Sequence, residues 1–226
     1  MPPSAPSSLA ALLVLGSANA LAGAQTLYSQ TPIDPCGFGY YSSTVARPNR
    51  NFKHADDFTI ASGGVIDRVR WWGMSEGRVS GTLGNFSAFT VEVFAANGAG
   101  TLPGTLLLTQ TFTQAQTSPT PTGRLAFDTG ATEYMQEIAL TSPFVATAGV
   151  KYFLAVSATP VVGAGDAWLW QDGTFVNGAS ALMSLSVGQW SVFQDSDSAF
   201  QLISVPAPGA ASPFLLLAAV GVRRRR

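Results

Sequence analysis

The sequence predicts an all-β fold, an antiparallel β-sandwich or jelly roll of about nine strands, and three observations lead to this prediction. Short runs rich in β-branched and aromatic residues recur along the whole central chain. Gly, Pro, Asn and Ser, the residues that favour turns, stand between these runs. No central stretch keeps the 3.6-residue apolar period of an amphipathic helix, so no helix is predicted that could connect parallel strands.

The composition fits a globular chain and excludes several classes of protein. Hydrophobic residues make up 46% of the 226 residues and charged residues only 11%, which is enough apolar material for a core and excludes wholesale disorder. The net charge of −1 argues against a nucleic-acid-binding protein. A single Cys and a single His exclude an internal disulfide framework, a zinc ribbon and multi-histidine metal sites. We therefore expect no cofactor.

The first strands, 58–60 and 65–72, are expected on either side of a glycine-rich turn. In the second strand the alternation places Val65 on the same face as Trp71, and the adjacent Trp72 points to the opposite face. One of the two tryptophans is therefore expected in the core. The other needs a second layer, a loop or a ligand to cover it.

The remaining strands follow the same pattern. The run 89–94 alternates apolar and polar residues before it ends at Asn97-Gly98, and the run 106–112 follows the turn 102–104. Residues 114–123, rich in Gln, Thr and Pro, are expected to form a surface loop within the same domain. The other expected strands are 137–140, 151–157, 167–171, 181–187 and 198–204.

The N-terminal residues 1–24 are typical of an export signal. The apolar run 9–15 is followed by Ala22-Gly23-Ala24, a small-x-small triplet of the kind that signal peptidases accept. We expect a signal helix that engages the export machinery and is cut after Ala24, in preference to Ala20. A buried amphipathic helix is the alternative, and the prolines within the segment argue against it.

The C-terminal residues 205–226 have three parts in a fixed order. Val205, Pro206, Ala207 and Pro208 come first, the 14 uncharged residues 209–222 follow, and Arg223, Arg224, Arg225 and Arg226 end the chain. A helix of this length spans about 21 Å, less than the roughly 30 Å of a bilayer's hydrocarbon core. The segment therefore predicts a short apolar helix in transient membrane contact, with its arginines on the cytoplasmic side. The predicted division is a signal peptide at 1–24, a β-sandwich domain at 25–204 and a sorting or anchor segment at 205–226.

This tripartite end resembles the PEP-CTERM sorting domain of bacterial surface proteins that exosortases process. Pro206 and Pro208 match the two prolines of the family's motif, 214–222 its apolar helix and 223–226 its basic end, while Ala207 stands in place of the usual Glu. The resemblance implies an exosortase-like processing enzyme as a partner. It also implies a bacterial protein located in the cell envelope, at the outer surface or in the extracellular matrix.

A second resemblance covers the middle of the chain. The phrases Ala55-Asp56-Asp57-Phe58 and Val69-Arg70-Trp71-Trp72-Gly73, with the runs 91–104 and 142–152, are similar to a sandwich domain common among exported bacterial proteins. The resemblance implies the fold. It implies no activity, because such domains are uncharacterised.

Two tryptophans form the sharpest candidate site. Trp168 and Trp170 are two residues apart in an expected strand and therefore share one face, with Asp172 close by. Exposed rings beside a carboxylate would suit a polysaccharide, whose apolar C–H face stacks while its hydroxyls form hydrogen bonds. The alternative is that both rings pack in the sandwich core.

Other residues carry weaker signals. His54 is expected at the surface near a strand start, because no nucleophile elbow accompanies it. The pairs Asp56-Asp57 and Asp195/Asp197 offer oxygen ligands to a structural calcium, but no EF-hand spacing supports one and solvated loops are the alternative. The lone Cys36 is expected to be either buried or available for pairing between molecules. Carboxylate pairs for glycoside hydrolysis could be drawn among the 13 acidic residues, so their number does not discriminate.

The sequence thus predicts an exported, non-enzymatic protein of the cell envelope or extracellular matrix, sorted by its C-terminal signal and able to bind polysaccharide. Two alternatives stay open. One is a secreted hydrolase that acts on polysaccharide, and the other is a purely structural surface component.

Overall fold

The computed structural model describes residues 23–36, 39–44, 51–76, 78, 81–127, 129–174, 178–194 and 196–205. Within these residues the chain is all-β, with fourteen strands and one short 3-10 helix, η1 (Gln114–Thr117), which confirms the predicted fold class. Residues Ala24–Val205 form one compact unit. The expected signal helix and the expected C-terminal apolar helix lie outside the described residues. Within the described part of the chain, no helix is long and apolar enough to cross a membrane.

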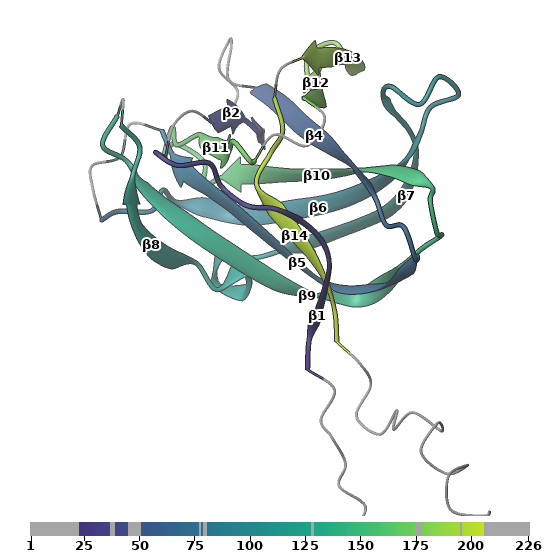
Figure 1. Cartoon of the computed structure of the whole chain (residues 1–226). Coiled ribbons are helices and arrows are strands. Elements are labelled where there is room, and N and C mark those ends of the chain that lie inside the picture. The colour runs from purple at the N-terminus through teal and green to yellow at the C-terminus, as the bar shows by residue number, and fades with distance from the viewer. Residues whose placement is uncertain are drawn as a thin grey trace, which may run out of the picture. The chain divides into compact units, whose positions relative to one another are not determined.

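The strands form two sheets that face each other as a sandwich (Figure 1). The first sheet contains β1 (Gln25–Gln30), β14 (Phe200–Ser204), β5 (Gly64–Ser75), β11 (Trp168–Gln171), β2 (Gly39–Tyr41), β9 (Thr132–Ala146) and β8 (Thr120–Leu125). The second sheet runs in the order β13 (Gln189–Gln194), β12 (Ala179–Ser184), β4 (Asn51–Thr59), β3 (Ser43–Thr44), β10 (Lys151–Pro160), β6 (Phe86–Ala96) and β7 (Pro103–Phe112). Among the described strands, only the contact of β3 with β10 is parallel.

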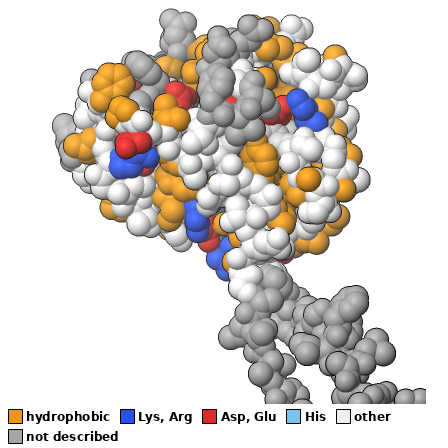
Figure 2. Space-filling view, in the orientation of Figure 1, with side chains coloured by type: hydrophobic (Ala, Val, Ile, Leu, Met, Phe, Trp, Pro, Cys, Tyr) orange, Lys and Arg blue, Asp and Glu red, His pale blue; other side chains and the backbone are white. Residues whose placement is uncertain are grey.

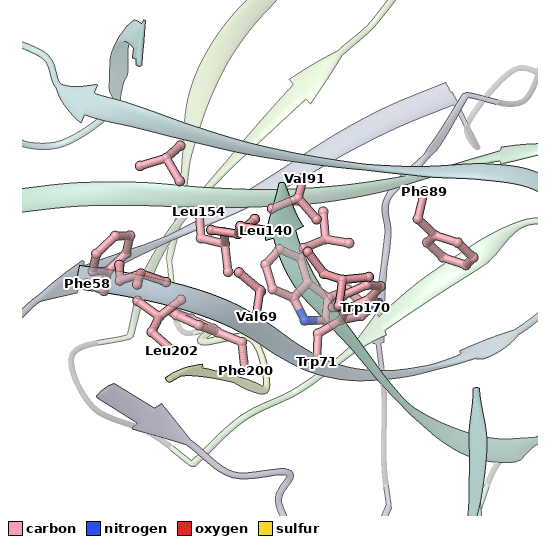
Figure 3. Packing of buried hydrophobic residues seen from close by; sticks show 14 of the residues in the cluster. Phe58, Val69, Trp71, Phe89, Val91, Leu140, Leu154, Trp170, Phe200 and Leu202 are labelled. Carbon is pink, nitrogen blue, oxygen red and sulfur yellow. The ribbon is translucent and has the colours of Figure 1, made fainter. Parts of the chain in front are cut away.

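The core lies between the sheets and is rich in aromatic rings (Figure 3). Trp71 of β5 and Trp170 of β11 come from the first sheet, and Phe58 of β4 and Phe89 of β6 come from the second. All four are at most 1% exposed. Burial of a large apolar side chain contributes about 1.5–3 kcal/mol, so this layer is the main source of stability.

An irregularity in the pairing of β5 with β9 changes which residues of β5 face the core. The partner of Ile66 is Phe144 and that of Arg68 is Ala139, so β9 carries the extra residues. At this point β5 also loses its strict alternation, because Ile66 and Val69, three residues apart, are both buried. The expectation that Val65 shares a face with Trp71 is therefore wrong. Ile66 is buried with Trp71, whereas Val65 is 41% exposed.

Each of the nine expected strands overlaps a strand of the structure, and five further strands were not expected: β1, β2, β3, β8 and β13. One of these, β8, corrects the interpretation of 114–123 as a loop. That stretch contains η1 and the start of β8, which pairs with β9 through Thr120 and Pro121 and shifts register before Leu125. Pro121 and Gly123 within β8 explain why the sequence reads as a loop.

The two ends of the compact unit lie side by side. β1 pairs with β14 in antiparallel fashion, so that Gln25 is the partner of Ser204. The Asp67 carboxylate accepts a hydrogen bond from the Val205 N–H at 2.9 Å, which fixes the chain directly after β14. The first and last strands of the domain thus support each other.

A glutamine side chain joins the two sheets along one edge. Gln110 of β7 accepts a hydrogen bond from the N–H of Thr141 at 2.8 Å and donates one to the carbonyl of Ser142 at 2.8 Å. Both residues belong to β9, which lies in the other sheet. The amide therefore takes the place of a neighbouring strand at this point of the β9 edge.

Candidate functional site

The tryptophans of the expected platform are buried. Trp168 and Trp170 do share one face of β11, but both are 0% exposed and face the core between the sheets. The Trp168 ring meets Phe89 edge-on at 5.2 Å, and the indole N–H of Trp170 donates to the carbonyl of Ala199 at 2.9 Å. The prediction of an exposed platform is therefore wrong and the core alternative is confirmed, because residues of the second sheet, such as Phe89 of β6, cover this face of β11.

Asp172 belongs to a different group of residues, which we call the carboxylate cluster: Asp56, Asp172 and Asp197. Asp56 lies fully buried in β4 and accepts hydrogen bonds from the N–H groups of Ser198 at 2.5 Å and Asp57 at 2.8 Å. Burial raises the pKa of Asp172 to about 7, and the nearby Asp197 adds to this rise. Burial likewise raises the pKa of Asp56 well above its usual value, with further contributions from the charges of Asp197 and Asp57.

The carboxylate cluster brings together two sequence motifs that were expected to form separate loops. Asp56 and Asp57 are 0% and 2% exposed and Asp197 is 1% exposed, so the described members do not form solvated loops. Asp195 lies outside the described residues. Among the residues that the structure describes, no group of three His, Cys, Asp or Glu side chains is arranged to hold a metal ion. The cluster instead connects β4, the end of β11 and the residues before β14.

His54 is in the interior and not at the surface as expected. The strand β4 begins at Asn51, earlier than predicted, and this places His54 at an inward position well inside the strand. Its ring stacks on Tyr40 at 4.9 Å and meets Trp170 edge-on at 6.0 Å. Burial lowers the pKa of His54 to about 3, so the ring is neutral at physiological pH.

A second hydrophobic cluster lies on the outer face of the second sheet, and we call it the outer patch. Its buried members are Ala55, Phe94, Phe153, Ala155 and Ala181. Trp190 of β13 packs against it, meeting Phe94 of β6 edge-on with ring centroids 5.7 Å apart. At this level β4 pairs directly with β10, so β12, β4 and β10 separate β13 from β6. The contact therefore requires the sheet to curve until the β12–β13 hairpin reaches over its outer face.

Two ion pairs lie on the same outer face. The Lys53 Nζ is 2.5 Å from a carboxylate oxygen of Glu92, and both side chains are mostly buried. The Lys151 Nζ is 2.5 Å from a carboxylate oxygen of Asp57, whose side chain is only 3% exposed. Figure 2 shows that, on the visible face of the molecule, basic and acidic side chains are also few and lie next to each other. These pairs provide donors and acceptors without giving the outer patch a net charge.

The outer patch is the candidate binding site because it combines a partly exposed aromatic ring, Trp190, with fixed polar groups. Such a surface can stack on the apolar face of a sugar while paired charges form hydrogen bonds with its hydroxyls. Trp190 is a site residue that was not among the candidates expected from the sequence. The signal that could have found it is the turn 185–188 followed by the alternation of Gln189-Trp190-Ser191-Val192, which is typical of the second strand of a hairpin.

Each of the four glutamates has its own partners. Glu76 accepts a hydrogen bond from the Tyr41 hydroxyl, and Glu92 pairs with Lys53. Glu133 is paired with Arg124, and Glu137 with both Arg68 and Arg70. Burial acts to raise the pKa of Glu137, but the hydrogen bonds from the two arginines outweigh it and hold this pKa below its usual value.

The lone thiol is buried, in agreement with the first of its two expected states. Cys36 is 3% exposed, and its Sγ lies 3.7 Å from a carboxylate oxygen of Glu133 and 3.5 Å from the amide oxygen of Gln171. It packs with Met74 beneath the outer surface of the first sheet. The thiol is therefore part of the folded domain and is shielded from other molecules.

The structure describes only part of the expected processing signals. Ala24 lies directly before β1, and Val205 lies directly after β14. The other residues of the expected sorting signal, Pro206, Ala207, Pro208, Arg223, Arg224, Arg225 and Arg226, lie outside the described residues.

Comparison with known proteins gives a family without an assigned activity. No curated protein and no solved structure matches the chain. One family model matches residues 26–206, which is most of the chain and nearly the same span as the compact unit Ala24–Val205. The chain therefore belongs to the family described as a domain of unknown function, DUF7901.

Proposed function

We propose that this chain is an exported, non-enzymatic β-sandwich protein of the bacterial cell envelope or extracellular matrix. The export machinery recognises residues 1–24, and an exosortase-like enzyme processes the sorting segment 205–226. The observation that carries this proposal is an agreement of boundaries. The compact unit begins at Ala24, where the small-x-small pattern predicts the cut, and ends at Val205, where the tripartite segment begins.

The sorting part of the proposal predicts the mass of the mature protein. Intact-mass analysis of the chain isolated from envelope or matrix material should show a species that lacks residues 1–24 and everything beyond about residue 208. Replacement of Arg223–Arg226 by four glutamines is the matched control, because it removes the charge and keeps the length. This variant should retain its C-terminal segment. Wild-type molecules that still carry Arg226 would overturn the proposal and favour a permanent anchor.

We further propose that the domain binds polysaccharide through the outer patch. The buried Trp168 and Trp170 cannot serve this purpose, and Trp190 takes their place. Its ring is partly exposed, and Lys53 and Glu92 hold hydrogen-bonding groups in fixed positions nearby. The balanced charges of the two ion pairs favour a neutral sugar chain over a strongly acidic one.

A glycan array tests this binding with the full exported protein. Trp190→Ala should weaken glycan affinity about tenfold, corresponding to a loss of roughly 1.4 kcal/mol. Phe127→Ala is the matched control, because Phe127 is an aromatic residue, 65% exposed, that lies outside the outer patch. Equal binding by wild type and Trp190→Ala would contradict the site. No binding to any glycan would favour a structural surface component, and release of new reducing ends would favour a hydrolase.

A further inference from the structure

Gln25 would be the N-terminal residue of the mature chain if the signal segment is cut after Ala24. Gln25 is the first residue of β1, its side chain is exposed, and its partner in the sheet is Ser204. Figure 1 shows β1 lying beside β14 at this end of the sandwich. A cut after Ala24 would leave no residue in front of the strand, and its free amino group would belong to a glutamine.

We propose that Gln25 is converted to pyroglutamate in the mature protein. This inference rests on the proposed removal of residues 1–24. The unprotonated α-amino nitrogen attacks the side-chain amide carbon Cδ, a new N–Cδ bond closes a five-membered lactam, and the Cδ–Nε2 bond breaks. The amine gives up one proton, and the amide nitrogen leaves as ammonia. Nothing is oxidised or reduced, and no co-reactant is needed.

The structure favours this reaction over the alternatives at the same end. The ring is made only from atoms of Gln25, so the pairing of Thr26 with Ile203 and of Ser29 with Gln201 can stay as it is. The exposed side chain leaves room for the ring to close and for ammonia to escape. A cut after Ala20 would instead expose Leu21, which has no side-chain amide and cannot form the lactam.

The lactam would protect a strand on which the interior depends. Among the described strands, β1 pairs only with β14, and its residues reach deep into the sandwich. The Tyr28 hydroxyl donates to the carbonyl of Asp57 at 3.3 Å, and the fully buried Gln30 amide lies 2.9 Å from the Asp56 carboxylate. A lactam has no free amine for an aminopeptidase to bind, so trimming toward Tyr28 is blocked at the first residue. It also removes the positive charge of the α-amino group, whose ordinary pKa is about 7.7–8.0.

Mass spectrometry of the full chain after export tests the inference. The purified protein is first treated with a reagent that methylates free amines, and its N-terminal peptide is then sequenced. The expected peptide begins at Gln25, is about 17 Da lighter than the unmodified sequence because ammonia is lost, and carries no methyl group on its first nitrogen. Pyroglutamyl peptidase should remove this residue. The matched control is Gln25→Asn, whose shorter side chain would have to close a four-membered ring and should keep its ammonia and its free amine.

The outcomes separate the two proposals. A peptide that begins at Gln25 with a methylated amine and an intact amide overturns the pyroglutamate inference and leaves export processing in place. A peptide that begins at Leu21, or a chain that keeps residues 1–24, overturns the proposed cut after Ala24 and the inference with it. A mass loss equal in wild type and Gln25→Asn would assign the loss to another residue and would also overturn the inference.

Discussion

Three titratable side chains, of which Asp56 and His54 are fully buried and Asp172 is partly buried, make the stability of the sandwich depend on pH in opposite directions. Burial raises the pKa of Asp56 and Asp172 and lowers the pKa of His54. A raised acid pKa means that the folded state holds its proton more tightly than the unfolded state, and a lowered histidine pKa means the reverse. The effects overlap at mildly acidic pH, so single variants are needed to separate them.

Asp172→Asn should make the domain more stable than wild type at high pH. The folded pKa of Asp172 is about 7 and its ordinary value is 3.8, so its contribution is fully present below pH 3.8 and is lost as the pH rises through 7. Asparagine cannot ionise and avoids this loss. Because the side chain is only partly buried, we expect a gain of about 1–2 kcal/mol at pH 8 and little difference at pH 4. Urea unfolding at both pH values measures the stability difference between the variant and wild type. A difference that does not change with pH would contradict the raised pKa of Asp172.

His54→Phe should resist mild acid better than wild type. The folded pKa of His54 is about 3, below its ordinary 6.5, so wild type loses stability as the pH falls from 6.5 toward 3. Phenylalanine keeps a ring that can stack on Tyr40 and takes up no proton. Relative to the difference at pH 8, the variant should gain about 3 kcal/mol at pH 4. Thermal melts at both pH values test this, and parallel pH profiles for the two proteins would refute it.

The positions of Trp168, Trp170 and His54 show what the alternation of side chains along a strand can and cannot predict. The period of two correctly places Trp168 and Trp170 on one face, but it does not say whether that face is inside or outside. The choice depends on which face of β11 the second sheet covers, and the strands of that sheet come from distant parts of the chain. For His54 the error came from the start of β4, since a strand that begins at Asn51 turns an expected surface residue into an interior one.

At the scale of elements, long apolar strands were predictable and short ones were not. β5, β6 and β10 carry enough β-branched and aromatic residues to be recognised alone. β3 has two residues, and β8 contains Pro121 and Gly123, so their strand conformation comes from pairing with a neighbour and not from their own composition. A bulge such as that between Ile66 and Arg68 is likewise set by the partner strand.

Gln110→Ala should destabilise the edge at which β7 meets β9. The substitution removes an acceptor for the Thr141 N–H and a donor to the Ser142 carbonyl. Water can replace these partners because the edge is exposed, so we expect a loss of about 1 kcal/mol, typical of a hydrogen bond at such a position. Thr109→Ala, one residue away on the same strand and exposed, should change stability by less than about 0.5 kcal/mol. Equal effects of the two substitutions in urea unfolding would show that the amide does not join the sheets.

At the scale of the whole molecule, the outer patch with Trp190 exists only because the second sheet curves. Trp190 and Phe94 are far apart in the sequence and in the strand order, yet their rings meet at 5.7 Å. No local pattern in the chain predicts this contact, whereas the alternation around Trp190 could have predicted a strand there. The interior carboxylate cluster has the same origin, since Asp56 and Ser198 are joined by the packing of β4 against the segment that leads into β14.

The whole domain should depend on its first strand and not on the segment after Val205. The sheets and the core are complete within Ala24–Val205, so a chain that ends at Val205 should melt within about 2 °C of a chain that continues to Arg226. Removal of Gln25–Gln30 strips β14 of its outer neighbour, exposes the site of Tyr28 and takes the Gln30 amide away from Asp56. An uncompensated buried polar group and lost packing together should cost several kcal/mol and lower the melting temperature by about 10 °C or more. Calorimetry of the two truncated chains decides the point, since equal melting temperatures would mean that β1 is dispensable and that the sandwich begins further along the chain.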